Sequence, residues 1–264
     1  NITGIDFSGR DLTGTILRGA DLTDANITSI DFSGRDLTGT ILRGLDLSDK
    51  DLTGTILRGA MFAPTDLTDA ILPSGYLSGK ELNYTILNGV DLSGKDLTES
   101  NFYRAKFVDA NLENANLSSA LFVDVDLTKI KNKSLAGAKL YGTSFSHSNL
   151  SGVNLDGALM QQVNFSNADL SDVDFSVISH STRDSPWSEG SLFIDANLSN
   201  ANFEGVDMRP SVFDNITFKN KANLKNLEGQ ELLDNLFPDQ LNANINIISK
   251  EVHGNDLVVK AIIY

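Results

Sequence analysis

Residues 6–19 read DFSGRDLTGTILRG, and the same phrase returns at residues 31–44. A close copy begins at Asp46, and all the offsets between these copies are multiples of five. Within and between the copies, a Leu, Ile or Phe recurs at every fifth residue from Ile2 to Leu127. A period of five fits neither an α-helix, which repeats about every 3.6 residues, nor a strand, which repeats every two. The period instead predicts a coil of short segments, each pointing one large apolar anchor inward.

The five-residue phase breaks twice along the chain. Residues 128–134 add three residues before the anchors restart at Leu135, and residues 176–192 form a longer insertion before the anchors resume at Phe193. If four pentapeptides make one turn, the anchors up to Phe218 predict about ten turns. We therefore expect an all-β solenoid over residues 1–218, with phase breaks at 128–134 and 176–192.

The repeat fades in residues 219–264, which we interpret as a C-terminal cap or the start of a following domain. Leucines near helical spacing occupy residues 224–236, and Pro238 would end such a helix. Two apolar clusters then flank the turn signal His253-Gly254-Asn255. The sequence thus predicts a short helical cap, which a solenoid needs because its last turn otherwise presents an open strand edge.

Composition excludes several function classes. The chain has no Cys, so it predicts no disulfide, no thiolate metal site and no cysteine nucleophile, and its three His residues share no ligand spacing. The net charge of −14 disfavours direct contact with nucleic acid. The chain contains no apolar run long enough to span a membrane. We therefore predict no cofactor, no metal and no enzymatic activity.

A repeat already in phase at Ile2, with no initiator Met, indicates a piece of a longer protein. Any catalytic domain would then lie outside these residues. The compartment is left open between the bacterial cytoplasm and secretion into a host cell.

Around each anchor the chain reads small residue, Asp or Asn, Leu or Phe, then two polar residues. Examples are residues 20–24 (ADLTD), 110–114 (ANLEN) and 168–172 (ADLSD). This pattern resembles the pentapeptide-repeat family, whose consensus is A-(D/N)-L-x-x, over roughly residues 2–218. The resemblance implies a right-handed quadrilateral parallel β-helix with four pentapeptides per turn. The residues agree with it, because the anchor and the residue two before it would alternate large and small inside a narrow core.

Basic residues depart from this pattern at the small inward position, namely Arg10, Arg35, Lys50, Lys80 and Lys95. A buried unpaired charge is very costly, so we expect these side chains to reach solvent at a corner of the coil and to widen it locally.

Four aspartates precede anchors on one face of the expected coil: Asp11, Asp31, Asp51 and Asp91. One hypothesis is an acidic, DNA-like surface, as the resemblance implies for pentapeptide proteins that protect DNA gyrase from quinolones. The other is structural, because Asp or Asn at this position can bond the backbone of the corner.

Apolar residues occupy the outward position on two adjacent faces, where the repeat calls for Asp or Asn. Ile41, Ile56, Met61 and Tyr76 fall on successive turns, with Arg43 and Arg58 beside them. A contiguous apolar patch bordered by Arg is typical of a protein interface. The insertion contains the single Trp, Trp187, a residue type enriched at interfaces, so it is a second candidate for partner binding.

These observations favour a protein-interaction module that binds a protein partner through its side faces or its inserted loop. The varied repeats, the insertion and the tail look like pentapeptide domains of secreted bacterial effectors, in which case the partner would be a host protein. The alternative is an acidic DNA mimic that binds DNA gyrase or another topoisomerase. A structural spacer is a third reading.

Overall fold

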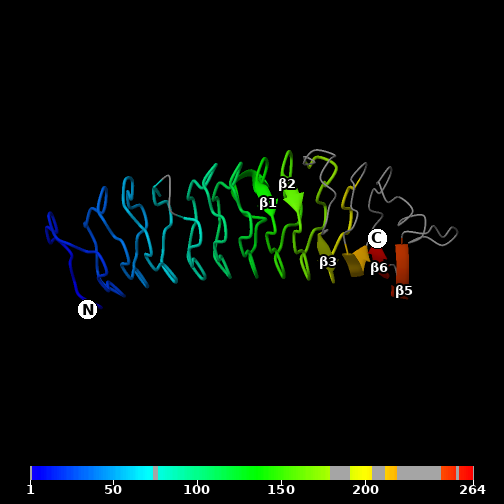
Figure 1. Ribbon diagram of the computed structural model, residues 1–264, viewed down its shortest axis with the longest axis horizontal. Helices are drawn as coiled ribbons and strands as arrows, with labels where there is room; N and C mark the ends of the chain where they lie inside the picture. The colour runs from blue at the N-terminus through cyan, green and yellow to red at the C-terminus, as the bar shows by residue number, and fades with distance from the viewer. Residues whose placement is uncertain are drawn as a thin grey trace.

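The computed structural model describes residues 2–73, 77–178, 191–203, 212–218, 245–253 and 256–263. The described repeats form an elongated coil whose turns stack along the long axis of the molecule (Figure 1). The N-terminus lies at one end of this rod, and the strands that follow the repeats lie at the other.

Parallel β-bridges link residues that lie one turn apart. They join Asp46 to Asp66, Asp66 to Ile86 and Ile86 to Lys106, and the partners in each pair are separated by four pentapeptides. Four pentapeptides therefore make one turn, as the sequence predicts. Residues in the same phase form columns along the rod, so each side of the coil can be described as a column of outward residues.

Most corners of the coil are tight turns closed by the anchor residue. The carbonyl oxygen of Phe7 accepts the N–H of Arg10 at 2.9 Å, and that of Leu17 accepts the N–H of Ala20 at 2.9 Å. At most corners the second residue after the anchor has a positive φ, 69° at Gly39, as the third position of a type II turn requires. Gly adopts this conformation without a steric cost, and Asp or Asn tolerates it.

The two phase breaks leave the columns intact. After the first break a bridge joins Asn116 to Lys139, and the short 3₁₀ segment η1 (Lys131–Lys133) takes up the extra residues of this turn. After the second break a bridge joins Asp169 to Asn197, so the insertion lengthens one turn without shifting the column. The strands β1 (Lys139–Tyr141) and β2 (Leu159–Gln161) pair in parallel in the same way as the bridges.

The core contains one anchor from each side of each turn. One column of anchors consists entirely of phenylalanine over five turns, and its ring centroids lie 4.7, 5.5, 5.7 and 5.2 Å apart. Its members are Phe102, Phe122, Phe145, Phe165 and Phe193, all 0 % exposed. Small inward residues such as Ala110, Ala115 and Ala120 are also fully buried and leave room for the rings.

A four-stranded sheet ends the described fold. The strands β3 (Leu192–Ile194) and β4 (Val212–Phe218) continue the parallel ladder, and β5 (Ile245–His253) and β6 (Asp256–Ile263) form an antiparallel hairpin. Because β6 pairs antiparallel with β4, the hairpin covers an edge that the ladder would otherwise leave open. The hairpin agrees with the turn signal at residues 253–255, whereas the predicted helix at 224–236 lies outside the described residues.

Three of the five inward cations, Arg35, Lys80 and Lys95, bond the backbone of the preceding turn. The side chain of Lys80 is buried, and its Nζ donates to the carbonyl oxygen of Leu57 at 2.7 Å. Lys95 Nζ lies 3.3 Å from the carbonyl oxygen of Leu72. The expectation that these side chains reach solvent is therefore wrong for Lys80, although Arg10 is exposed. The reason is that an anchor carbonyl has a second lone pair that can accept a donor from the next turn.

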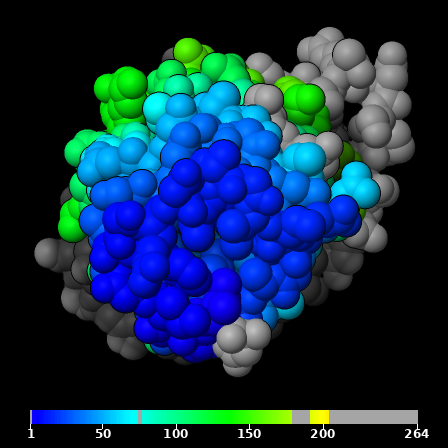
Figure 2. Space-filling model, turned by 90° about the vertical axis from the view of Figure 1, so that its left-hand side faces the viewer, coloured from blue at the N-terminus to red at the C-terminus, as the bar shows by residue number. Residues whose placement is uncertain are grey.

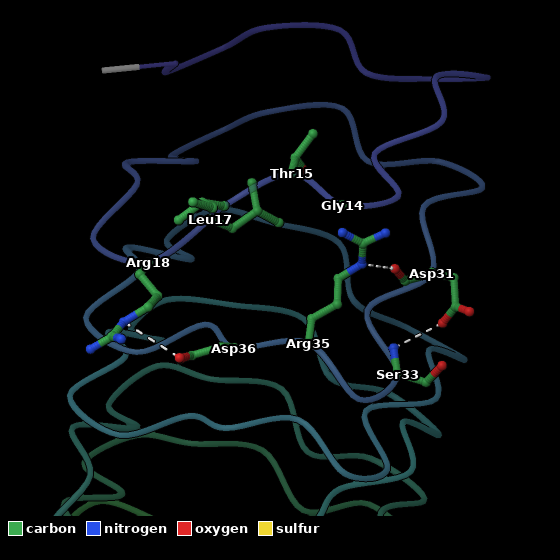
Figure 3. A pocket seen from close by; sticks show the side chains of 9 residues that line it. Gly14, Thr15, Leu17, Arg18, Asp31, Ser33, Arg35 and Asp36 are labelled. Carbon is green, nitrogen blue, oxygen red and sulfur yellow. Dashed lines mark hydrogen bonds and ion pairs between the residues drawn. The ribbon is translucent and has the colours of Figure 1, made fainter.

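The expected widening occurs at Arg35. Its Nε donates to the carbonyl oxygen of Asp31 at 2.8 Å (Figure 3). Its Nη1 donates to the carbonyl oxygen of Leu12 at 2.7 Å. Among the described residues, no bridge joins Asp31 or Asp36 to the first turn. The guanidinium lies between these two turns. It lines a surface cavity of about 510 Å³ at this gap.

We predict that Lys80→Thr stabilises the protein by about 1 kcal/mol, because it removes a buried charge and keeps a donor for Leu57. Thr40, two turns earlier in the same column, makes the equivalent bond to the Leu17 carbonyl at 2.9 Å. Urea unfolding followed by circular dichroism measures the effect. Exposed Lys139→Thr is the matched control and should change stability little.

The pH dependence gives an independent readout. Burial holds the pKa of Lys80 below its usual value of 10.5. Between the lowered pKa and 10.5 the unfolded chain binds more protons than the folded chain, so this lysine makes stability rise with pH in that window. The stability difference between Lys80→Thr and wild type should therefore shrink as the pH rises. A difference that stays constant up to pH 10.5 would contradict the assignment.

Candidate interaction surface

The outward columns define four sides of the rod, which we name after one residue each. In order around the coil they are the Lys106 face, the Asp51 face, the Ile56 face and the Ile41 face. The Lys106 face contains Asp46, Asp66, Ile86, Lys106 and Asp126, and the Asp51 face contains Asp11, Asp31, Asp51, Ile71 and Asp91. The Ile56 face contains Ile16, Asp36 and Ile56, and the Ile41 face contains Asp21, Ile41, Met61, Glu81, Asn101 and Leu121.

Three of the predicted apolar residues lie together on the Ile41 and Ile56 faces, near the N-terminal end of the rod that faces the viewer in Figure 2. Ile41 is paired by a bridge with Met61 on the next turn. Met61 is 46 % exposed and Ile56, one pentapeptide before it, is 43 % exposed. Ile41 itself is half-buried. The outward position is therefore apolar and accessible at two adjacent points of the coil.

Two arginines flank these residues at the corners. Arg58 lies at the corner between Ile56 and Met61, and Arg43 lies at the next corner after Ile41; both are exposed. Tyr76 and Trp187, the other two candidates, lie outside the described residues. The structure thus brings five of the seven candidate residues onto two adjacent turns and does not place the remaining two.

The four aspartates of the predicted acidic ladder share the Asp51 face, where Ile71 interrupts them. The Oδ1 atom of each accepts the N–H of the residue two positions later, at 2.7 Å for Asp51 and 2.8 Å for Asp11. Asp31 and Asp91 make the same bond at 2.8 and 3.0 Å. Each carboxylate therefore closes a corner of the coil.

These hydrogen bonds lower the pKa of all four carboxyls. The largest cause is the side-chain bond from the following Ser or Thr at Asp11, Asp51 and Asp91, and the backbone bond from Ser33 at Asp31. The carboxylates remain exposed at the surface. The described residues hold no group of carboxylates and histidines able to bind a metal ion. The ladder thus has a structural role at its corners and also displays negative charge.

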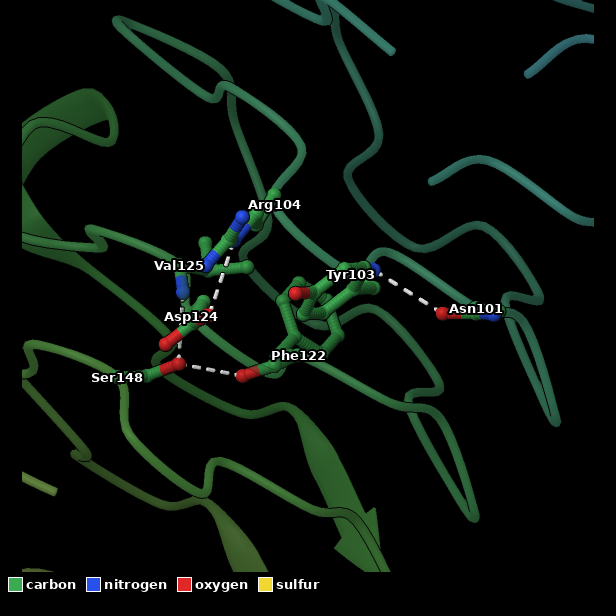
Figure 4. A network of polar contacts seen from close by, with 7 residues as sticks. All are labelled: Asn101, Tyr103, Arg104, Phe122, Asp124, Val125 and Ser148. Carbon is green, nitrogen blue, oxygen red and sulfur yellow. Dashed lines mark hydrogen bonds and ion pairs between the residues drawn. The ribbon is translucent and has the colours of Figure 1, made fainter. Parts of the chain in front are cut away.

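One cluster escaped the sequence reasoning. The rings of Tyr84 and Tyr103 meet edge to face with centroids 5.4 Å apart, and the guanidinium carbon of Arg104 lies 5.1 Å from the centroid of Tyr103. Arg104 Nε lies 3.0 Å from Asp124 Oδ2 and is held by it, as Figure 4 shows. Tyr84 is 47 % exposed and has a φ of 59°, which is uncommon for a bulky side chain.

The cluster also shifts the pKa values of its members. The bond to Asp124 raises the pKa of Arg104, and loss of solvation raises the pKa of the Tyr103 phenol. The signal was present in the sequence, because four pentapeptides per turn place Arg104 directly after Tyr84 in one corner column. The repeat pattern draws attention to the residue before each anchor, whereas these side chains follow the anchors.

Comparison with known proteins identifies the repeats. The family model for pentapeptide repeats matches in eight copies, over residues 1–39, 36–73, 76–114, 96–130, 135–176 and 189–216. The chain belongs to the pentapeptide-repeat family. Members of this family fold as right-handed β-helices and are generally structural or binding modules. No curated protein matches the chain. No helix of the described residues is long and apolar enough to cross a membrane.

Several solved pentapeptide-repeat structures are similar to this chain at low identity. HetL, involved in regulating heterocyst differentiation in the cyanobacterium Nostoc, is 24 % identical over 75 % of this chain and 88 % of its own, with a TM-score of 0.27. QnrB1, a plasmid-mediated fluoroquinolone resistance protein, is 18 % identical over 85 % of this chain and 96 % of its own, with a TM-score of 0.35. A thylakoid-lumen protein of Arabidopsis thaliana is 26 % identical over 50 % of this chain and 69 % of its own, with a TM-score of 0.26.

We predict that Asp51→Ala destabilises the pentapeptide-repeat coil by about 1 kcal/mol, whereas Asp51→Asn changes stability by a few tenths. Asn keeps the acceptor for the N–H of Thr53, as Asn26 does for Thr28 at 3.1 Å. Thermal unfolding followed by circular dichroism measures both. Equal destabilisation by the two substitutions would show that the charge, rather than the corner hydrogen bond, stabilises this position.

Proposed function

We propose that this chain is a protein-binding module that recognises a protein partner through the junction of its Ile41 and Ile56 faces. The observation that carries the proposal is the exposure of Ile56 and Met61 at positions where the repeat otherwise places Asp or Asn. These side chains contribute nothing to the core, which the anchors fill. Exposing them to water is therefore unfavourable, and packing inside the chain does not offset that unfavourable free energy.

The composition of the patch also supports binding. Met adapts its shape to a partner, and Arg is enriched at binding hot spots. Arg43 and Arg58 supply positive charge at the border of an apolar centre on a chain whose net charge is −14. A partner with apolar side chains surrounded by carboxylates would complement this arrangement. Tyr76 and Trp187, which the sequence also indicates as candidates for partner binding, would extend the same function.

We further propose that the module serves a secreted bacterial effector, with a host protein as the partner. This rests on the varied repeats, the insertion and the C-terminal tail.

The test is a binding comparison between variants that place Asp on different faces. Ile56→Asp combined with Met61→Asp should weaken partner binding at least tenfold, about 1.4 kcal/mol, because it places charge in the apolar centre. The control is Ile71→Asp, which alters an apolar residue that is 57 % exposed on the Asp51 face. Both variants should keep the melting temperature within a few degrees, since exposed substitutions usually cost about 0.5 kcal/mol or less.

Affinity capture with quantitative mass spectrometry, followed by calorimetry with the purified partner, supplies the measurement. Normal binding by the double variant would move recognition to the inserted loop, which Trp187→Ala examines separately. Loss of folding in the double variant would show that these positions are structural.

A second candidate, the DNA mimic, is favoured by the exposed ionised carboxylates of the Asp51 face. It predicts that the chain inhibits supercoiling by DNA gyrase or protects gyrase from quinolones. Charge reversal at Asp11, Asp31, Asp51 and Asp91 should remove this effect, and salt should weaken it. Because reversal also removes four corner bonds, the Asn substitutions at the same positions are the informative set. Absence of any effect of the wild-type chain at micromolar concentration would exclude this candidate.

A further inference from the structure

Two successive turns present opposite charges across the Lys106 face and its corners. The first turn presents Arg104, Lys106 and Asp109, and the next presents Asp124, Asp126 and Lys129, all exposed. Two contacts fix the alignment of the turns: the Arg104–Asp124 ion pair at 3.0 Å, and the bond from the Asp109 N–H to the Lys129 carbonyl oxygen at 2.8 Å. The charge order across one turn is therefore the inverse of the order across the next.

This inversion makes the face complementary to itself. A two-fold axis that runs across the face between these two turns superimposes each turn on the other turn of a second, antiparallel copy. Arg104 then meets the second copy's Asp124, Lys106 meets its Asp126 and Asp109 meets its Lys129. The same operation brings Tyr103 opposite Val123 and Tyr84 opposite His147 of the second copy. Each contact occurs twice, as a two-fold interface requires.

The net charge of the chain disfavours self-association through the acidic parts of its surface. Copies with a net charge of −14 repel one another over most of their surface. The charges of the six residues named above sum to zero, because three are cations and three are anions. Lys106 also interrupts a column in which Asp46, Asp66 and Asp126 occupy the same position. The face is thus a neutral break in an acidic rod.

Exposed apolar side chains in the same region give association a driving force. Tyr84 is 47 % exposed at one corner and Val108 is 41 % exposed at the other. Burying them against a second copy removes apolar surface from water. The Tyr84–Tyr103–Arg104 contacts already hold the polar groups in place, which reduces the entropy lost on binding.

We propose that the Lys106 face, from Tyr84 to His147, is a two-fold interface through which two copies of this chain associate side by side and antiparallel. The contact spans only about four turns, or roughly 15–20 Å along the rod, so it belongs to the small, weak class of interfaces. A dissociation constant in the micromolar range is expected.

Two single variants and their mixture test the proposal. Lys106→Glu places like charges opposite Asp126 in a homodimer, and Asp126→Lys does the same opposite Lys106. Each variant alone should dimerise at least tenfold more weakly than wild type in sedimentation equilibrium. In an equimolar mixture both contacts of the heterodimer become opposite in charge, so the mixture should regain the dimer. Lys139→Glu, an equal charge change at an exposed residue on the opposite side of the rod, is the control and should leave dimerisation intact.

Cross-linking tests the antiparallel register. Because the chain has no Cys, Arg104→Cys and Asp124→Cys each introduce a single thiol. Mild oxidation of the two variants mixed together should give a disulfide-linked heterodimer faster than either variant gives a homodimer. Circular dichroism melting of every variant confirms folding, and the mixture cannot regain a dimer through any effect within one chain.

Three results would overturn the proposal. The first is a wild-type chain that stays monomeric at several hundred micromolar. The second is a Lys106→Glu variant that dimerises as wild type does. The third is a mixture that associates no better than its two components.

Discussion

The inward-facing carbonyl oxygen of each anchor residue is the group on which the structure depends. It closes the corner by accepting the N–H three residues later, as Leu17 does from Ala20 at 2.9 Å. Its second lone pair faces a narrow interior, and a donor on the next turn can satisfy it. Thr40, Thr65, Lys80 and Ser100 all use the small inward position for this bond. Polar inward residues in an otherwise apolar core are therefore explained by the geometry of the corner, and Thr or Ser satisfies the carbonyl without a charge to desolvate.

The two halves of the rod differ in how the inward positions beside the anchors are filled. The inward cations all lie before residue 100, where Arg35 occupies a gap between turns. Beyond residue 100 the Phe column packs with centroids 4.7–5.7 Å apart, and the inward positions beside it are mostly Ala or Val. The later turns thus gain more from apolar burial and ring packing, whereas the earlier turns rely more on hydrogen bonds to carbonyls. Local opening should begin in the earlier turns, which also contain the Ile56–Met61 patch.

The five-residue period predicted the coil and the outward position of Ile56 and Met61, and the resemblance to the pentapeptide-repeat family supplied the four pentapeptides per turn. It could not predict how Lys80 is accommodated, since that depends on the free lone pair of Leu57, which lies on the preceding turn. The Tyr84–Tyr103–Arg104 cluster was missed for a related reason. Its members follow the anchors at corners, where the consensus places no restriction, so no departure from a pattern revealed them. The effect of the insertions was also predictable only in part: the longer spacing between bridged partners follows from the phase breaks, but the conformation of η1 does not.

The same geometry explains how a uniform scaffold can present different surfaces. Side chains at the outward positions do not pack in the core, so a substitution there changes the surface at one point and leaves the core unchanged. Asp and Asn are the commonest residues at the outward positions because they bond the backbone of the corner, as Asp51 does at 2.7 Å. The aspartates consequently make the rod acidic. A surface that differs from this background must then give up a corner bond at each changed position. Ile56, Met61 and Lys106 each lack the side-chain acceptor that an Asp would supply. Exposed apolar residues also occur singly, as at Ile71, but Ile56 and Met61 adjoin each other, and we infer that binding there, and not folding, is what these two substitutions serve.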